Sequence, residues 1–101
     1  MDKELYVATK NYLEKVFKKV LIERTSDYTS IIALMDDGEG IVLCIWDRRT
    51  HVYAKISSLS KTTFLECRDL LLQPYGLFIF ARDKVEFMEK LRNKLKVIGY
   101  G

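Results

Sequence analysis

The sequence predicts one α+β (mixed α/β) domain over residues 1–101, with a central mixed β-sheet flanked by three helices. Three observations favour this class. A chain of 101 residues is long enough for one small hydrophobic core. Apolar residues make up 49% of it, as is typical of a globular protein. The spacing of these residues changes repeatedly between a helical period and an extended one.

Three segments carry apolar residues three and four positions apart, the spacing that places them on one side of a helix. These segments are Lys3–Lys19, Lys61–Leu72 and Asp83–Leu95. The pair Asp83 and Glu86 is similar to a capping box and predicts where the last helix begins.

Short apolar runs and period-two alternation predict the strands. The expected strands are Val20–Arg24, Thr29–Met35, Ile41–Asp47, Val52–Ser57 and Leu77–Ala81, with Lys96–Tyr100 as a further edge strand. The second and third are apolar at successive positions, which predicts central strands covered on both sides. Between them, Asp36–Gly40 contains Asp-Gly, a pair typical of hairpin turns. The order is α-β-β-β-(β)-α-β-α-(β).

The two later strands differ in character. Val52–Ser57 alternates apolar and polar residues, which predicts a peripheral strand with one face on the core and the other in water. Leu77–Ala81 is a short continuous apolar run after a helix, which predicts a buried strand.

Cysteine usage and hydropathy indicate the compartment. Cys44 and Cys67 lie within apolar patterns, so we expect reduced core residues of an intracellular protein. The N-terminal residues do not resemble a signal peptide, and no apolar run approaches the roughly 18–20 residues of a membrane span. The expectation is a cytoplasmic protein that does not contact membrane. Few Asn and Gln beside many Lys and Glu favour a thermophilic source, archaeal or viral.

Basic and aromatic residues gather around the turn after Asp47. The chain carries a net charge of +3, which is compatible with a polyanionic partner. The candidate nucleic-acid-binding residues are Arg48, Arg49, Tyr53, Lys55 and Lys61. Lys and Arg neutralise phosphates, and exposed aromatic rings stack on bases, so DNA or RNA is the expected partner. The alternative is a sheet edge kept charged against pairing with other molecules. His51, next to this turn, is expected to be a surface histidine.

The order helix, three-strand meander, helix, strand resembles the core of the PD-(D/E)xK nuclease superfamily, and most closely the archaeal Holliday junction resolvases. The matching segments are Ile31–Met35, the turn at Asp36–Gly40, Ile41–Arg48, the extended stretch Val52–Lys55, Lys61–Leu72 and Leu77–Ala81. The resemblance implies a restriction-endonuclease-like fold. In that family an Asp and a Glu on adjacent strands bind a divalent metal, and a Lys lies two positions after the Glu.

The acids that this family needs are missing here. The resemblance places Ala33 at the Asp position, Trp46 at the Glu position and Arg48 at the Lys position. Neither Ala nor Trp can ligate Mg²⁺, so no catalytic residue, metal site or cofactor is expected. If the acids have instead moved, Asp47, Lys55 and Glu14 would be the catalytic residues, with Mg²⁺ as cofactor.

Three hypotheses follow. The first is a non-catalytic nucleic-acid-binding protein of nuclease-like fold, acting as a homodimer or as a partner subunit of a larger complex. The second is a small protein-interaction or structural protein of a thermophilic archaeon or its virus. The third is a metal-dependent nuclease with displaced ligands.

Overall fold

The computed structural model describes residues 3–48, 50–58 and 77–100. In chain order, the elements are helix α1 (Lys3–Val16), strands β1 (Lys19–Arg24), β2 (Thr29–Leu34), β3 (Gly40–Asp47), β4 (Val52–Ser58) and β5 (Leu77–Ala81), and helix α2 (Lys84–Val97). The α+β class is therefore confirmed, with two helices among the described residues. The helix expected at Lys61–Leu72 lies outside them.

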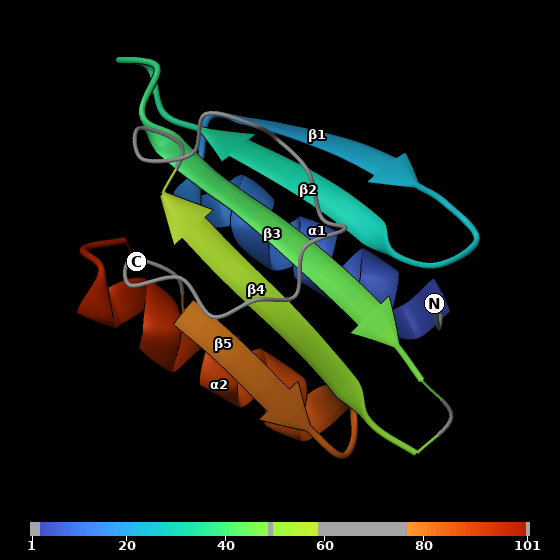
Figure 1. Cartoon of the computed structure of the whole chain (residues 1–101). Coiled ribbons are helices and arrows are strands. Elements are labelled where there is room, and N and C mark those ends of the chain that lie inside the picture. Colours follow the sequence, from blue (N-terminus) through green and yellow to red (C-terminus); the bar gives the residue numbers. More distant parts are fainter. Residues whose placement is uncertain (1–2, 49, 59–76, 101) are drawn as a thin grey trace.

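The five strands form one sheet in sequence order, β1-β2-β3-β4-β5 (Figure 1). Every described pairing is antiparallel, so the expectation of a mixed sheet is wrong. The physical reason lies in the connections. Each of the strands β1, β2 and β3 is joined to the next strand by a short turn, and a hairpin turn reverses the chain direction. β5 then pairs with β4 in the antiparallel sense as well.

Both helices cover the same face of the sheet, and the main core lies between the two layers (Figure 1). Alternate strand residues point into this core, because successive side chains of a strand point to opposite faces. The fully buried members from the strands include Ile31, Ile41, Leu43, Ile45 and Ile56. Those from the helices include Leu5, Leu13, Phe87, Leu91 and Leu95.

The second face of the sheet, turned away from the helices, carries a smaller apolar cluster. Its buried members are Val42, Cys44 and Trp46, all on β3. β3 is therefore apolar on both faces, as the sequence predicts. Cys44 is buried as expected, but it is disulfide-bonded rather than a free thiol. Cys67, which shares the prediction of a reduced residue, lies outside the described residues.

β4 does not lie at the sheet edge. It pairs with β3 on one side and with β5 on the other. Lys55 and Ser57, which the alternation places in water, are buried at 5% and 4% exposure. The alternation correctly predicts the inward face, where Val52, Ala54 and Ile56 lie. It cannot predict that both neighbouring strands are present.

β5 is the edge strand instead. It pairs only with β4 among the described residues. Ile79 and Ala81 point into the main core, while Phe80 on the other face is 58% exposed. The prediction of a buried strand therefore holds for one face only.

The hairpin between β2 and β3 forms where Asp-Gly predicts it. Gly38 has φ of +85°, a conformation that favours glycine. The Asp37 side chain accepts a hydrogen bond from the Glu39 amide at 2.9 Å. Gly40, the first residue of β3, passes so close to Ala33 that an added Cβ would overlap the Ala33 carbonyl oxygen.

α2 continues through Val97, so the edge strand expected at Lys96–Tyr100 is wrong. Gly99, at φ of +95°, ends the helix, and the Tyr100 amide bonds the Leu95 carbonyl oxygen at 2.7 Å. This is the Schellman pattern, which satisfies the last helical carbonyls. The Tyr100 ring then packs on Phe17, with ring centroids 4.9 Å apart. Among the described residues, neither helix is long and apolar enough to cross a membrane.

Candidate nucleic-acid interface

Five aromatic rings form a row across one end of the second face, and each ring contacts the next. We call Tyr28, Trp46, Tyr53, His51 and Phe80 the aromatic row. Successive ring centroids are 6.1, 5.6, 5.6 and 5.0 Å apart. The last three contacts are stacked, with interplanar angles of 18°, 16° and 21°. The row therefore runs from the start of β2 to the edge strand β5.

Strand register builds the row. Trp46 lies directly opposite Tyr53, and Tyr53 lies directly opposite Phe80. Residues opposite one another on antiparallel strands share a face, so these rings align across three strands. His51, in the turn after β3, lies between Tyr53 and Phe80.

From Trp46 onwards, exposure rises along the row towards the sheet edge. Trp46 is only 4% exposed, whereas Phe80 is 58% exposed. Tyr53 and His51 are half-buried between them. A ligand in solution can therefore contact the His51 and Phe80 end of the row, while Trp46 serves as its support.

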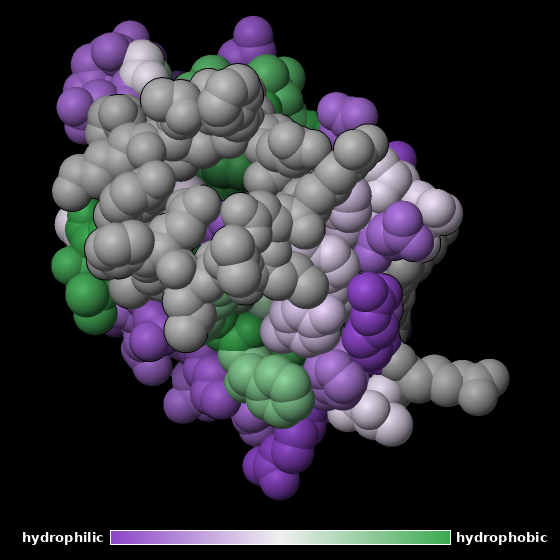
Figure 2. Space-filling model, in the orientation of Figure 1, coloured by the Kyte–Doolittle hydropathy of each residue, from purple (hydrophilic) through white to green (hydrophobic). Residues whose placement is uncertain are grey.

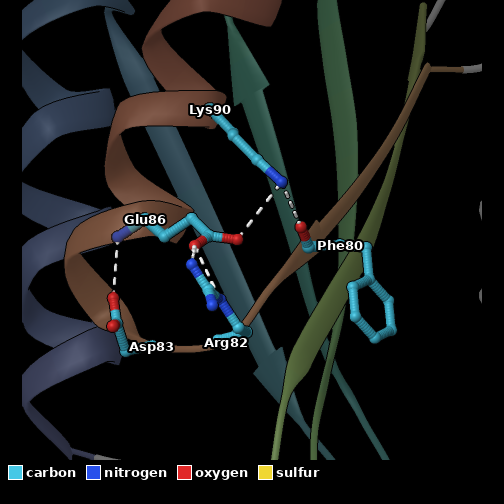
Figure 3. Close-up of polar contacts among 5 residues, drawn as sticks. All are labelled: Phe80, Arg82, Asp83, Glu86 and Lys90. Carbon is cyan, nitrogen blue, oxygen red and sulfur yellow. Dashed lines mark hydrogen bonds and ion pairs between the residues drawn. The ribbon is translucent and has the colours of Figure 1, made fainter.

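Polar contacts fix the backbone and the helix beside Phe80 (Figure 3). The Lys90 amine on α2 donates to the Phe80 carbonyl oxygen at 2.6 Å and pairs with Glu86 Oε1 at 3.2 Å. Arg82 donates to Glu86 Oε2 through Nε and Nη2, both at 3.3 Å. The hydrogen bond from Lys90 and the neighbouring Arg82 lower the pKa of Glu86. The Phe80 ring points away from this network, towards the second face.

A groove opens between β5 and α2, next to Phe80. It encloses about 360 Å³ and is lined by Phe78, Phe80, Lys90, Asn93, Lys94 and Val97. We call it the β5–α2 groove. Among the described residues, its lining contains two aromatic rings, two lysines and no acidic residue. Figure 2 shows apolar and hydrophilic side chains adjoining one another in the lower part of this face, where Figure 1 places β5.

A second cavity, of about 320 Å³, is lined in part by His51. Its lining mixes the basic Arg48, Arg82 and Lys84 with the acidic Asp47 and Asp83. Arg48 is exposed and donates through Nη1 to the Asp27 carbonyl oxygen at 3.4 Å. Because its charges nearly balance, this cavity is a weaker anion site than the β5–α2 groove.

The structure brings together only part of the predicted basic patch. Arg48 and Tyr53 lie at the same end of the sheet as the exposed end of the row. Lys55 is on the second face but buried, so the phosphates of a bound polyanion would not reach it. Arg49 and Lys61 lie outside the described residues.

The residues of the nuclease resemblance do not converge. Ala33 points into the main core between sheet and helices, while Trp46 is on the second face. Glu14 lies on the surface of α1, paired with Lys10 at 4.0 Å, on the opposite side of the sheet from Lys55. Asp47 is half-buried at the end of β3. Over the described ranges, no three His, Cys, Asp or Glu residues lie close enough to hold a metal ion.

Sequence reasoning places His51 at the surface but missed it as part of an aromatic row, and it missed Phe78 and Phe80 as parts of a surface. The signal was present in Leu77–Ala81, where Phe78 and Phe80 alternate with Ile79 and Ala81. Period two is typical of a strand with one face outside the core. Lys90 and Lys94 are one turn apart on α2, but sequence alone does not show which strand they lie beside.

Comparison of the chain with protein-family models, curated proteins and solved structures found no match.

Proposed function

We propose that the protein binds single-stranded nucleic acid at the exposed end of the aromatic row, as a non-catalytic binding protein. The observation that supports this most is the stack of Tyr53, His51 and Phe80, which ends in a ring that is 58% exposed. Bases of a single strand stack on such rings, and each contact contributes about 1–3 kcal/mol. A ring held by its neighbours loses little freedom when a base stacks on it.

Arg48 supplies a cation that lines the same cavity as His51. Its guanidinium is exposed, and its hydrogen bond to the Asp27 carbonyl oxygen leaves other donors available to a phosphate. The net charge of +3 favours approach of a polyanion from solution. In this proposal a base stacks on the exposed Phe80 ring at the end of the row, which His51 supports, and the backbone follows Arg48.

The test is anisotropy of labelled single-stranded, duplex and four-way DNA, and of single-stranded RNA, over a salt titration. We expect the single strands to bind more tightly than duplex, and affinity to fall as salt rises. Phe80→Ala should weaken binding about tenfold, whereas Val85→Ala, an exposed apolar residue away from the row, should not. Arg48→Glu should weaken it further than Lys15→Glu on the exposed surface of α1.

Trp46 provides an independent readout. It is the only tryptophan of the chain and stacks on Tyr53. A ligand bound at the row should change its fluorescence with the same midpoint as the anisotropy. Equal affinity of the wild type and Phe80→Ala for every oligonucleotide would refute the proposal.

Protein docking is the second candidate, because α2 exposes two apolar residues. Val85 is 71% exposed and Val97 is 76% exposed. A partner protein, or a second copy of this chain, would bury them and would bind with little dependence on salt. This candidate would be favoured if the wild type retained a protein partner that the Val97→Asp variant does not retain, and if the wild type bound no oligonucleotide.

The nuclease-like fold and a displaced nuclease site stay predictions. Mg²⁺- or Mn²⁺-dependent cleavage that Asp47→Asn abolishes would be needed to support them.

A further inference from the structure

We infer that the β5–α2 groove takes one nucleotide of the bound strand, with its base against Phe78 and Phe80 and its phosphate at Lys94. This inference rests on the proposed function, because the groove begins at Phe80, where the aromatic row ends. A strand with a base stacked on Phe80 has its next nucleotide at the mouth of the groove.

The chemistry of the lining fits a nucleotide. Phe78 and Phe80 offer apolar faces to a base, and Asn93 offers both an amide donor and an acceptor to a base edge. The volume of about 360 Å³ lies within the range of small-ligand sites, roughly 300–1,000 Å³. The lining residues that the structure describes include no acid that would repel a phosphate.

Lys94 is the cation available to that phosphate. The Lys90 amine is already held by Glu86 and by the Phe80 carbonyl oxygen. Lys94 lines the same groove, and the described residues give it no ion-pair partner. Neutralising a phosphate with Lys94 therefore breaks no existing ion pair.

The same contact at Lys90 disfavours a peptide as the occupant. A peptide that extends a sheet must bond to the backbone groups of the edge strand. On β5 the Phe80 carbonyl oxygen already accepts from Lys90. A nucleotide needs the ring of Phe80 and not its carbonyl oxygen, so the contact does not hinder it.

The experiment measures oligothymidylate affinity, over a length series and a salt titration, for Lys94→Glu and Asn93→Ala. Lys96→Glu is the matched control, because Lys96 carries the same charge on the same helix and is exposed outside the groove. Lys94→Glu should weaken the binding of long oligomers about tenfold. It should also lower the slope of log affinity against log salt by about 0.7, which corresponds to the loss of one phosphate contact. Lys96→Glu should stay within about twofold of wild type. For a dinucleotide, which the row alone accommodates, all three variants should match wild type.

Three results would overturn the inference. If Phe80→Ala weakens binding while Lys94→Glu and Lys96→Glu bind oligothymidylate with equal affinity, the aromatic row binds the strand and the groove does not. In that case this inference fails and the proposed function stands. If no oligonucleotide binds, both proposals fail. If an acidic peptide binds in place of oligonucleotides and Lys94→Glu abolishes this, the groove belongs to a protein partner. Circular dichroism and urea midpoints equal to wild type would show that each variant is folded.

Discussion

The Lys90 amine lies 2.6 Å from the Phe80 carbonyl oxygen and so occupies a hydrogen-bonding position on the outer edge of β5. An unpaired strand edge can pair with the edge of another molecule, and natural sheets often place a lysine there. In this chain the lysine comes from the neighbouring helix, and its charge is matched by Glu86 at 3.2 Å.

Replacement of this lysine should therefore increase self-association. We expect Lys90→Met, which keeps the apolar stem but loses the donor, to sediment as a larger species than wild type at the same concentration. Lys96→Met removes the same charge from the same helix and should behave as wild type. Identical sedimentation of the two variants would show that Lys90 does not protect the edge.

The Glu86 carboxylate should make stability depend on acid pH. The hydrogen bond from Lys90 lowers its pKa in the folded protein below the ordinary value of 4.5. A lowered folded-state pKa means that the stabilisation is fully present above the unfolded-state pKa and is lost as the pH falls through the folded-state value. Urea unfolding over this acid range should show a smaller fall in stability for Glu86→Gln than for wild type. A parallel pH profile in the two proteins would contradict the assignment.

The Asp83 carboxylate caps α2 by accepting a hydrogen bond from the Glu86 amide at 2.9 Å. Asp83→Ala should lower the free energy of unfolding by about 1 kcal/mol, because that amide then has no partner in the helix. Asp83→Asn keeps an acceptor and should recover most of the loss. Urea denaturation of both variants measures the difference, and equal losses would show that charge rather than capping matters.

Gly40 should tolerate no side chain, because a Cβ there overlaps the Ala33 carbonyl oxygen of the paired strand. We expect Gly40→Ala to lower the free energy of unfolding by at least about 2 kcal/mol, through forced separation of β2 and β3. Gly38→Asn is the comparison: nothing lies within 4 Å of its Cβ, and Asn tolerates a positive φ. Its loss, by urea or thermal unfolding, should stay below about 1 kcal/mol.

Local features of the fold could be predicted because they depend on neighbouring residues. Asp83 and Glu86 mark the start of α2 where the capping pattern places it. The Asp-Gly pair gives the hairpin between β2 and β3. The aliphatic residues of β3 are buried on both faces as their unbroken run indicates. Gly99, by contrast, lies in the segment Lys96–Tyr100 that the pattern predicts as a strand, although a glycine after a helical pattern is also a helix-ending signal.

The candidate site was predicted only at its near end, at Arg48 and Tyr53. Ring contacts such as His51 with Phe80 join residues far apart in the sequence and depend on strand pairing. Lys55 shows the same limit of sequence-based prediction. The alternation of β4 assigns Lys55 to the correct face of the sheet but does not predict that its side chain is buried.

By itself, the sequence determined the α+β class, most element boundaries to within a few residues and the inward residues of β4, because period and capping act over a few residues. Only the tertiary structure decided that the described strands all pair antiparallel, that β5 is the last of them at the edge, and that Phe80 lies between His51 and the lysines of α2. Those features depend on which strands pair and on where a helix packs, and the burial of apolar surface over the whole chain determines both.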